Sequence, residues 1–217
     1  MNNLETWRPR LMQLATVSNT DDGAHDLNHL NRVWQNAQTL LEDHPEADAL
    51  VVMAACYLHD LVNLPKNDPE RHLASRQAAQ LACGELEKLD FPVEKLPSLA
   101  HAIEAHSFSA GIAPETIEAR IVQDADRLDA LGAVGLARLY YTAGRMGSAL
   151  AHPTDPLAGH RTMDDKKFAL DHIEVKLATL PATMNTKAGQ KMGEIRLEWL
   201  RSFRDTFIAE WGSPDCS

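Results

Sequence analysis

The sequence holds few cysteines, few aromatic residues and no long apolar run. The three cysteines, Cys56, Cys83 and Cys216, have no paired spacing and form no CxxC motif, which argues against a disulfide framework and favours a reducing compartment. Aromatic residues are only 6% of the chain, which is little for a sheet-rich core. No apolar run has the length of a membrane span, and the first residues lack the apolar core of a signal peptide. We therefore expect a cytoplasmic protein.

Basic residues are also scarce. The 217-residue chain has 21 Lys and Arg against 31 Asp and Glu, a formal net charge of −10. A protein that binds a nucleic-acid backbone or an anionic membrane needs a basic surface, so we expect neither a membrane nor a nucleic-acid duplex as partner. A small anionic substrate is not excluded, because it responds to the local field of a metal site.

Apolar residues recur at helical spacing along nearly the whole chain, and no convincing period-two run indicates a strand. This pattern predicts an all-α fold. The expected helices cover Leu4–Ser18, Asp26–Glu42, Ala47–Leu61, His72–Leu89, Leu96–Ala105, Pro114–Leu131, Ala133–Ala143, Asp164–Leu180 and Lys187–Trp211. Pro114 is expected at the first position of its helix.

Two irregular segments interrupt this pattern, Val62–Arg71 and Gly144–Gly159. The chain has no internal repeat and no composition shift that marks a linker. We expect a single domain over residues 1–217, in which the last helices, about 160–211, extend a core of about residues 20–140.

A histidine and an aspartate, His59 and Asp60, lie together inside an apolar stretch. Such a pair is costly to bury unless something binds it. Neighbouring residues on a helix point about 100° apart, so both side chains reach one ion only if the ion lies between their directions. An imidazole nitrogen and a carboxylate oxygen suit a divalent first-row metal. The alternative for the dipeptide alone is a helix-end pair that binds nothing.

Two further segments change the interpretation of this pair. His29 lies upstream, four residues before Val33, and Asp126 lies downstream in the sequence Ala-Asp-Arg-Leu. The order of a histidine, a His-Asp pair and an aspartate resembles the HD-domain superfamily of metal-dependent phosphohydrolases. The resemblance implies a helical bundle of the HD type and the metal ligands His29, His59, Asp60 and Asp126. It also implies a divalent ion, Mn²⁺ or Mg²⁺, with Fe, Co, Ni and Zn as alternatives.

Three stretches resemble a bacterial subgroup of soluble HD hydrolases more closely. They are HDLVNLPKN at residues 59–67, IEAHSFS at 103–109 and IVQDADRLDALGAVG at 121–135. The resemblance, which spans roughly residue 20 to the end, implies a phosphohydrolase that acts on nucleotides or related phosphate compounds. The relatives suggest release of pyrophosphate from nucleoside triphosphates, with Asp60 helping to activate the attacking water.

The resemblance leaves alternatives. Some HD nucleotidases that act on monophosphates carry a glutamate three residues after the HD aspartate, where this chain has Asn63. The competing functions are another HD phosphomonoesterase or phosphodiesterase, a di-iron HD oxygenase and a non-catalytic metal-binding regulatory module. The expected partner is a small-molecule phosphate substrate, and the chain could form a homodimer.

Several acidic and histidine side chains could join the site. His106 is expected to be catalytic, as a donor to a substrate phosphate or to the leaving oxygen. Its alternative role is to hold a second metal together with His72, the only histidine between the His-Asp pair and His101. We expect His101 to be structural. Asp124 and Asp126 point roughly 160° apart on a helix, so one of them should reach the metal. Asp124 and Asp129 are candidates to orient a ligand imidazole.

Basic and hydroxyl side chains could bind the phosphates. Lys66 and Arg71 follow the His-Asp pair closely and could neutralise phosphate oxygens. Ser75 could donate a hydroxyl, and His25, four residues before His29, could face the substrate or support the site. Two residues of the C-terminal half, Arg145 and Lys176, could close the pocket, although such charges more often lie on the surface.

Overall fold

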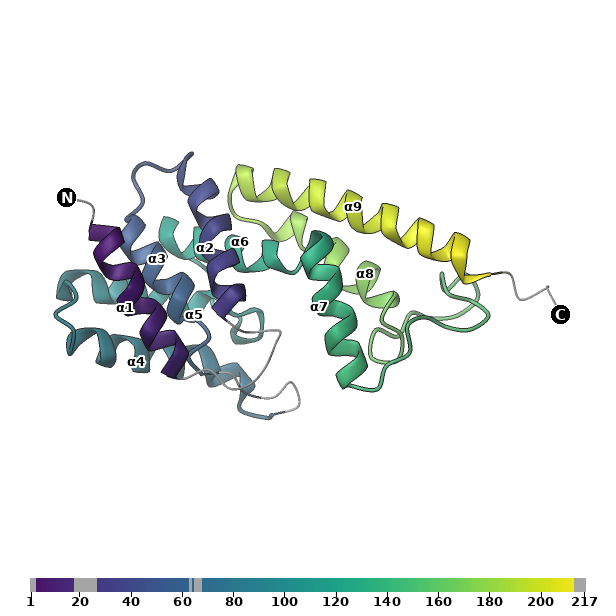
Figure 1. Ribbon diagram of the computed structural model, residues 1–217, viewed down its shortest axis with the longest axis horizontal. Coiled ribbons are helices and arrows are strands. Elements are labelled where there is room, and N and C mark those ends of the chain that lie inside the picture. Colours follow the sequence, from purple (N-terminus) through teal and green to yellow (C-terminus); the bar gives the residue numbers. More distant parts are fainter. Residues whose placement is uncertain (1–2, 18–26, 63, 65–67, 213–217) are drawn as a thin grey trace. The chain divides into compact units, whose positions relative to one another are not determined.

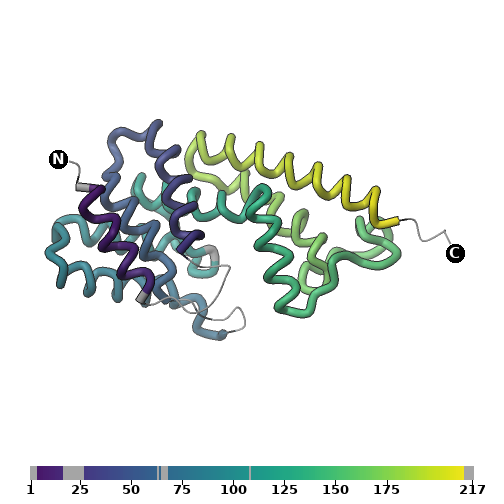
Figure 2. The backbone as a smooth tube through the Cα atoms, viewed as in Figure 1, coloured from purple at the N-terminus to yellow at the C-terminus, as the bar shows by residue number. Residues whose placement is uncertain are grey.

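The structure, a computed structural model, describes residues 3–17, 27–62, 64 and 68–212 (Figures 1 and 2). This described part is helical and contains no strand, only an isolated bridge between Ala149 and Phe168. The predicted all-α fold is confirmed. No helix among the described residues is long and apolar enough to cross a membrane.

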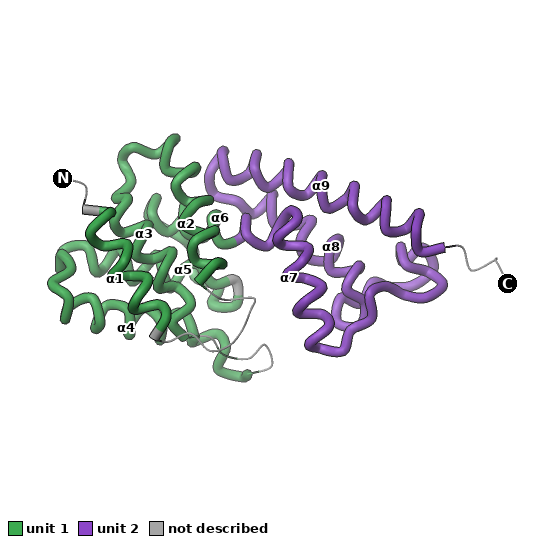
Figure 3. The backbone as a smooth tube through the Cα atoms, viewed as in Figure 1, with its two compact units in different colours: residues 1–126 green, residues 127–217 purple. Residues whose placement is uncertain are grey.

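The chain packs as two compact units, residues 1–126 and 127–217 (Figure 3). The division falls inside helix α6 (Ile117–Asp129). His29, His59, Asp60, His106 and Asp126 all belong to the first unit. The expected single domain over the whole chain stays a prediction.

Helix α3 (Ala49–Leu58) is the centre of the first unit. Every residue from Leu50 to Leu58 is buried, and a helix that is apolar on all sides needs neighbours on all sides. The helices that pack most extensively against it are α1 (Asn3–Val17), α2 (Leu27–Leu41) and α5 (Leu96–His106). Helix α4 (Ala74–Glu87) packs against α5, as Figure 1 shows.

Short 3₁₀ turns join these helices. They are η1 (Arg71–Leu73), η2 (Val93–Lys95) and η3 (Phe108–Ala110). Turn η1 lies against η3, which begins two residues after His106. The segment that follows the His-Asp pair therefore returns to the end of α5.

The second unit contains α7 (Gly132–Arg145), α8 (Asp171–Val175), η4 (Leu177–Thr179), η5 (Pro181–Thr183) and α9 (Lys187–Trp211). Helix α9 packs against α7 and η5, and it has the bounds that its sequence pattern predicts. Its fully buried Leu200 joins a core with Leu131, Ile173 and Leu177.

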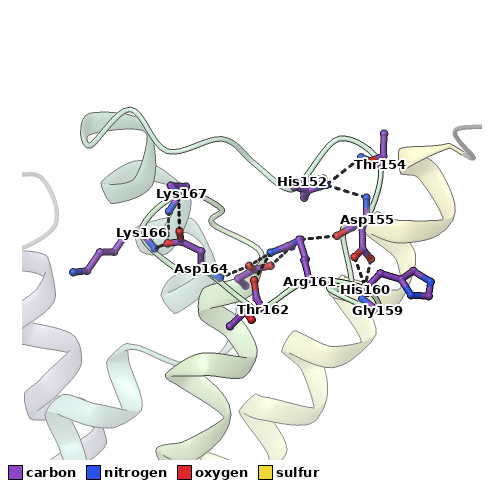
Figure 4. Close-up of polar contacts among 11 residues, drawn as sticks. His152, Thr154, Asp155, Gly159, His160, Arg161, Thr162, Asp164, Lys166 and Lys167 are labelled. Atoms are coloured by element: carbon purple, nitrogen blue, oxygen red, sulfur yellow. Dashed lines mark hydrogen bonds and ion pairs between the residues drawn. The ribbon is translucent and has the colours of Figure 1, made fainter.

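The predicted helix over Asp164–Leu180 is wrong. Only α8 and one short 3₁₀ turn, η4, form there, and residues 146–170 follow an irregular path (Figure 4). Side chains hold this path: Asp155 accepts hydrogen bonds from the backbone N–H groups of Gly159 and His160, and Arg161 pairs with Asp171. These local bonds compete with helix formation, as is usual for aspartate.

Two helix ends also differ from the prediction. Pro114 is not the first residue of its helix, because α6 begins at Ile117, where the Thr116 hydroxyl accepts a hydrogen bond from Ala119 N (3.2 Å) and caps the helix. Helix α3 ends at Leu58 instead of Leu61, so His59 and Asp60 stand at and beyond its end. This second difference shapes the site.

Candidate metal centre

His59 caps the C-terminus of α3, and Asp60 begins the turn that follows. The backbone N–H of His59 still donates to Ala55 O (2.9 Å), but Asp60 has left the helix. The imidazole Nδ1 of His59 lies 3.0 Å from Cys56 O. Because a carbonyl only accepts, Nδ1 carries the proton of the neutral ring, and Nε2 carries a lone pair.

Three further side chains, from α2, from the turn after α3 and from α6, lie around this nitrogen. The Nε2 of His59 lies 3.5 Å from Asp60 Oδ2 and 3.8 Å from Asp126 Oδ1. The Nε2 of His29, on α2, lies 3.8 Å from Asp60 Oδ2 and 3.6 Å from Asp126 Oδ1. Both histidines are about 1% exposed, whereas the carboxylate side chains are 22% and 29% exposed. The cluster is therefore buried on its histidine side and open on its carboxylate side.

This donor set fits a divalent cation. Two ligand atoms about 2.1 Å from one ion lie about 3.0–3.4 Å apart at usual coordination angles, only slightly closer than the 3.5–3.8 Å here. The buried Nε2 of His59 has no hydrogen-bond partner among the described residues. A buried lone pair that faces two carboxylates is unfavourable without a cation between them.

Comparison with known proteins places the chain in a family. The HD domain family matches residues 26–131, which include all four side chains of this cluster. The uncharacterized protein YpgQ of Bacillus subtilis (strain 168) is 30% identical over 204 residues, or 92% of this chain and 88% of YpgQ. The chain belongs to the HD-domain superfamily. His59 and Asp60, which the sequence resemblance implies to be the residues behind that name, are called the HD pair below.

Solved structures agree with this HD assignment. The crystal structure of B. subtilis YpgQ in complex with ADP has a TM-score of 0.70 at 28% identity and covers 95% of this chain and 93% of YpgQ. An HD-superfamily hydrolase from Bacillus thuringiensis has a TM-score of 0.73 at 26% identity, with 95% and 97% of the two chains covered. HD domains bind divalent metals, and the His/Asp cluster of this HD domain could hold one.

His106 adds a fifth donor to the HD cluster. It is the last residue of α5, and its Nε2 lies 3.8 Å from Asp60 Oδ1. Its Nδ1 lies 2.6 Å from Ile103 O, so the proton of the neutral ring is again on Nδ1. Burial, and then the nearby His59, lower the pKa of His106 below its ordinary value. The neutral ring offers a lone pair at Nε2 and can donate from that atom only after it gains a proton.

The donors form two overlapping sets whose ligand atoms all lie within 4.8 Å of one another. One set is His29, His59 and Asp126, and the other is His59, Asp60 and His106. His72, the expected companion of His106 at a second metal, is exposed, lies with its Nδ1 3.1 Å from Pro69 O and belongs to neither set. Among the described residues, the second set therefore shares His59 with the first set and adds Asp60 and His106, without His72.

The structure separates the three aspartates of α6. Asp126 faces both histidines, whereas Asp124 is fully buried and belongs to neither donor set. Asp129 is 2% exposed, and its Oδ2 lies 2.7 Å from Arg138 Nη1. Asp129 is thus held by an ion pair with Arg138 in the second unit.

Of the four residues expected to bind phosphate, the structure describes Arg71 and Ser75. His25 and Lys66 lie outside the described residues. A guanidinium nitrogen of Arg71 donates to Leu64 O, so Arg71 ties its own turn to the segment after the HD pair. Ser75 is 3% exposed, and its Oγ has no hydrogen-bond partner among the described residues.

The other charged and histidine candidates lie on the surface or in structural positions. His101 Nε2 accepts a hydrogen bond from Glu115 N (2.9 Å), which fits its expected structural role. Arg145 lies over the Tyr141 ring at 5.8 Å, and Lys176 is exposed, both in the second unit. Sequence reasoning missed two buried amides, Asn36 and Gln123, although each has a helical spacing from a site residue that could have indicated it.

Proposed function

We propose that this HD-domain protein is a metal-dependent phosphohydrolase that releases pyrophosphate from nucleoside triphosphates. The observation that carries the proposal is the cluster of buried imidazole nitrogens and partly exposed carboxylates around the lone pair of His59. The complex of the relative YpgQ with ADP supports a nucleotide as ligand, and the relative called an HD-superfamily hydrolase supports hydrolysis.

His29, His59, Asp60 and Asp126 would hold the ion. Two imidazoles and two carboxylates suit Mn²⁺, and carboxylate oxygens also suit Mg²⁺. When bound, such an ion supplies Lewis acidity, which polarises a phosphate oxygen and lowers the pKa of a water molecule. The two carboxylates supply the negative charge that retains the ion, and the neutral histidines add donors without further charge.

Asp60 would accept the proton that the attacking water loses. Its Oδ2 faces the two buried histidines, whereas its Oδ1 lies 3.8 Å from His106 Nε2. Its side chain is 22% exposed, so water and substrate can reach it. His106, with a lone pair at Nε2, can receive this proton and then donate it toward the leaving group. Asp60 would thus act as the general base and His106 as the general acid.

The phosphate chain needs donors beside the cluster. Arg71 and Ser75 are suited to this role because η1 and the first turn of α4 follow the HD pair and η1 lies against η3, just after His106. Lys66 and His25 are proposed as phosphate contacts from their positions in the sequence alone.

Product analysis tests this function. The purified protein would be incubated with Mn²⁺ or Mg²⁺ and ATP, GTP, dATP, ADP, AMP or p-nitrophenyl phosphate, and the products followed by ³¹P NMR. We expect a nucleoside monophosphate and pyrophosphate from the triphosphates. Orthophosphate from AMP or p-nitrophenyl phosphate would favour a phosphomonoesterase instead. No hydrolysis of any of these compounds by metal-loaded protein would contradict the proposal.

Elemental analysis separates the other function classes. After anaerobic purification, a phosphohydrolase is expected to hold an exchangeable divalent ion that supports hydrolysis. Two irons per chain with consumption of O₂ would favour an oxygenase. Metal bound without turnover of any substrate would favour a regulatory module.

A further inference from the structure

Two buried side-chain amides connect the three helices that carry His29, Asp126 and His106. Asn36 on α2 donates from Nδ2 to Ala125 O on α6 at 3.0 Å. Gln123 on α6 donates from Nε2 to Ala105 O on α5 at 2.6 Å. Their exposed fractions are 6% and 5%. In both cases the accepting carbonyl belongs to the residue immediately before a donor of the cluster.

The helical register places each amide on the same face as a cluster residue. Asn36 follows His29 by seven residues, which is close to two full turns of α2. Gln123 precedes Asp126 by three residues, which places both on one side of α6. Asn36 therefore lies about two turns from His29, and Gln123 lies about one turn from Asp126. Each amide is on the same face of its helix as that cluster residue.

These bonds fix positions because both partners are buried polar groups. If α6 moved relative to α2 or α5, an amide and a carbonyl would lose their bond away from water, and each unpaired group is costly. The hydrogen bond from Gln123 matters most for the carbonyl of Ala105, because the last carbonyls of a helix have no intrahelical donor and α5 ends at His106. A metal site tolerates displacements of only about 0.5 Å.

We propose that Asn36 and Gln123 are positioning residues, which set the spacing of His29, Asp126 and His106 around the ion. This inference rests on the proposed function. The two hydrogen bonds link α2 to α6 and α6 to α5, so α6 is fixed relative to both of the other helices. They act through the backbone of Ala125 and Ala105.

The test removes each donor and compares the loss with a matched control. Gln123→Leu and Asn36→Leu remove the amides, and Glu118→Leu is the control. Glu118 is also on α6 and also binds the backbone of another segment, because it accepts a hydrogen bond from Asp48 N (2.9 Å), but it stands eight residues before Asp126. Mn²⁺ affinity would be measured by titration calorimetry, and the unfolding of each metal-free variant in urea.

We expect Mn²⁺ to bind each amide variant about 10- to 100-fold more weakly than wild type, the usual effect of removing a group that orients metal ligands. The visible spectrum of the Co²⁺-loaded protein should also change. The Glu118→Leu protein should keep its Mn²⁺ affinity within about threefold, even if it loses similar stability. Amide variants that retain wild-type affinity and spectrum would overturn the proposal, as would an equal loss of affinity in the control.

Two further measurements keep the test decisive. If Gln123→Leu does not fold, Gln123→Met fills a similar volume without a donor and takes its place. The imidazole ¹⁵N spectrum of the metal-free protein gives a readout that needs no ion: the His106 resonances should move in the Gln123 variant and not in Glu118→Leu. If wild type binds no divalent ion, the proposed function fails, and unmoved His106 resonances would then refute the positioning role separately.

Discussion

His59 Nε2 and Asp60 Oδ2 lie 3.5 Å apart, although the two residues are neighbours in the chain. On a continuous helix their side chains would point about 100° apart. They converge because α3 ends at Leu58, so His59 still closes the helix while Asp60 already belongs to the turn. The end of the helix is therefore the local feature that allows both side chains to face one ion.

Removal of either member of this pair should abolish metal binding. We expect His59→Ala and Asp60→Ala to hold less than about a tenth of the wild-type metal and to lose hydrolysis, because the remaining donors cannot complete the coordination. Elemental analysis after dialysis and a pyrophosphate-release assay measure the two effects. If the Asp60→Ala protein keeps both its metal and its activity, the site assignment is wrong.

The two aspartates of α6 should differ in their effect on the ion. Asp126→Asn should reduce metal occupancy far more than Asp124→Asn, because Asp126 Oδ1 faces both histidines and Asp124 belongs to neither donor set. We expect at least about a tenfold difference in metal affinity between the variants. Calorimetric titration of both proteins decides the question, and an equal or reversed loss would show that the ligand is Asp124.

Phosphate recognition is tested by comparing two substrates. Lys66→Ala and His106→Ala should each lower kcat/KM by roughly one to three orders of magnitude and leave the protein folded with its metal. For Lys66→Ala the loss should be larger for a triphosphate than for p-nitrophenyl phosphate, because only the longer chain offers further oxygens. Lys88→Ala is the matched control, since Lys88 is an exposed lysine paired with Glu85 (2.7 Å).

Two results would change these roles. An equal loss on both substrates would make Lys66 a structural or general electrostatic residue. Loss of metal from His106→Ala would make His106 a ligand, which its place in the second donor set allows.

Asp48, the N-cap of α3, accepts hydrogen bonds from Leu50 N and Val51 N and gives a prediction for pH. Partial burial alone would raise the pKa of Asp48, but its bonds with Lys95, Val51 N and Leu50 N outweigh burial and lower the pKa below its ordinary value. A lowered carboxyl pKa stabilises the fold above the unfolded-state pKa of about 4, and this contribution is lost as the pH falls through the folded-state value. Asp48→Ala should cost about 1 kcal/mol at pH 7.

Asp48→Asn separates the cap from the charge. Asparagine can still accept hydrogen bonds as a cap but does not titrate, so the stability difference between wild type and Asp48→Asn should shrink below about pH 4. Urea unfolding at several pH values measures this difference. A difference that stays constant down to pH 2.5 would contradict the assigned role of the Asp48 charge.

The ion pair of the irregular segment should matter for its stability. Arg161 binds Asp171 through both terminal nitrogens, at 2.6 and 2.7 Å, and the Asp171 side chain is only 2% exposed. Arg161→Met would leave that carboxylate buried without its cation, and we expect a loss of about 3 kcal/mol. Limited proteolysis should then cut faster within residues 146–170, and unchanged cleavage would argue against this role.

The sequence predicted the helical fold and the cluster more fully than the details around them. Helix α9 and the convergence of His29, His59, Asp60 and Asp126 follow from apolar spacing and from the family pattern. The irregular segment Gly144–Gly159 was predicted as well, but its continuation to residue 170 in place of a helix was not, because Arg161 and Asp171 are ten residues apart and no local periodicity indicates their pairing. The same holds for Gln123 and Ala105, whose bond depends on how two helices pack.

All five donors of the cluster, from His29 to Asp126, precede the second unit, which begins at Arg127. A ribosome that makes this chain therefore completes the whole set of donors before it adds residues 127–217. Because domains tend to fold in the order in which they are synthesised, we expect the donors to assemble, and to be able to bind the proposed ion, before the second unit is complete. Capture of the ion would then be an early event in the life of the molecule.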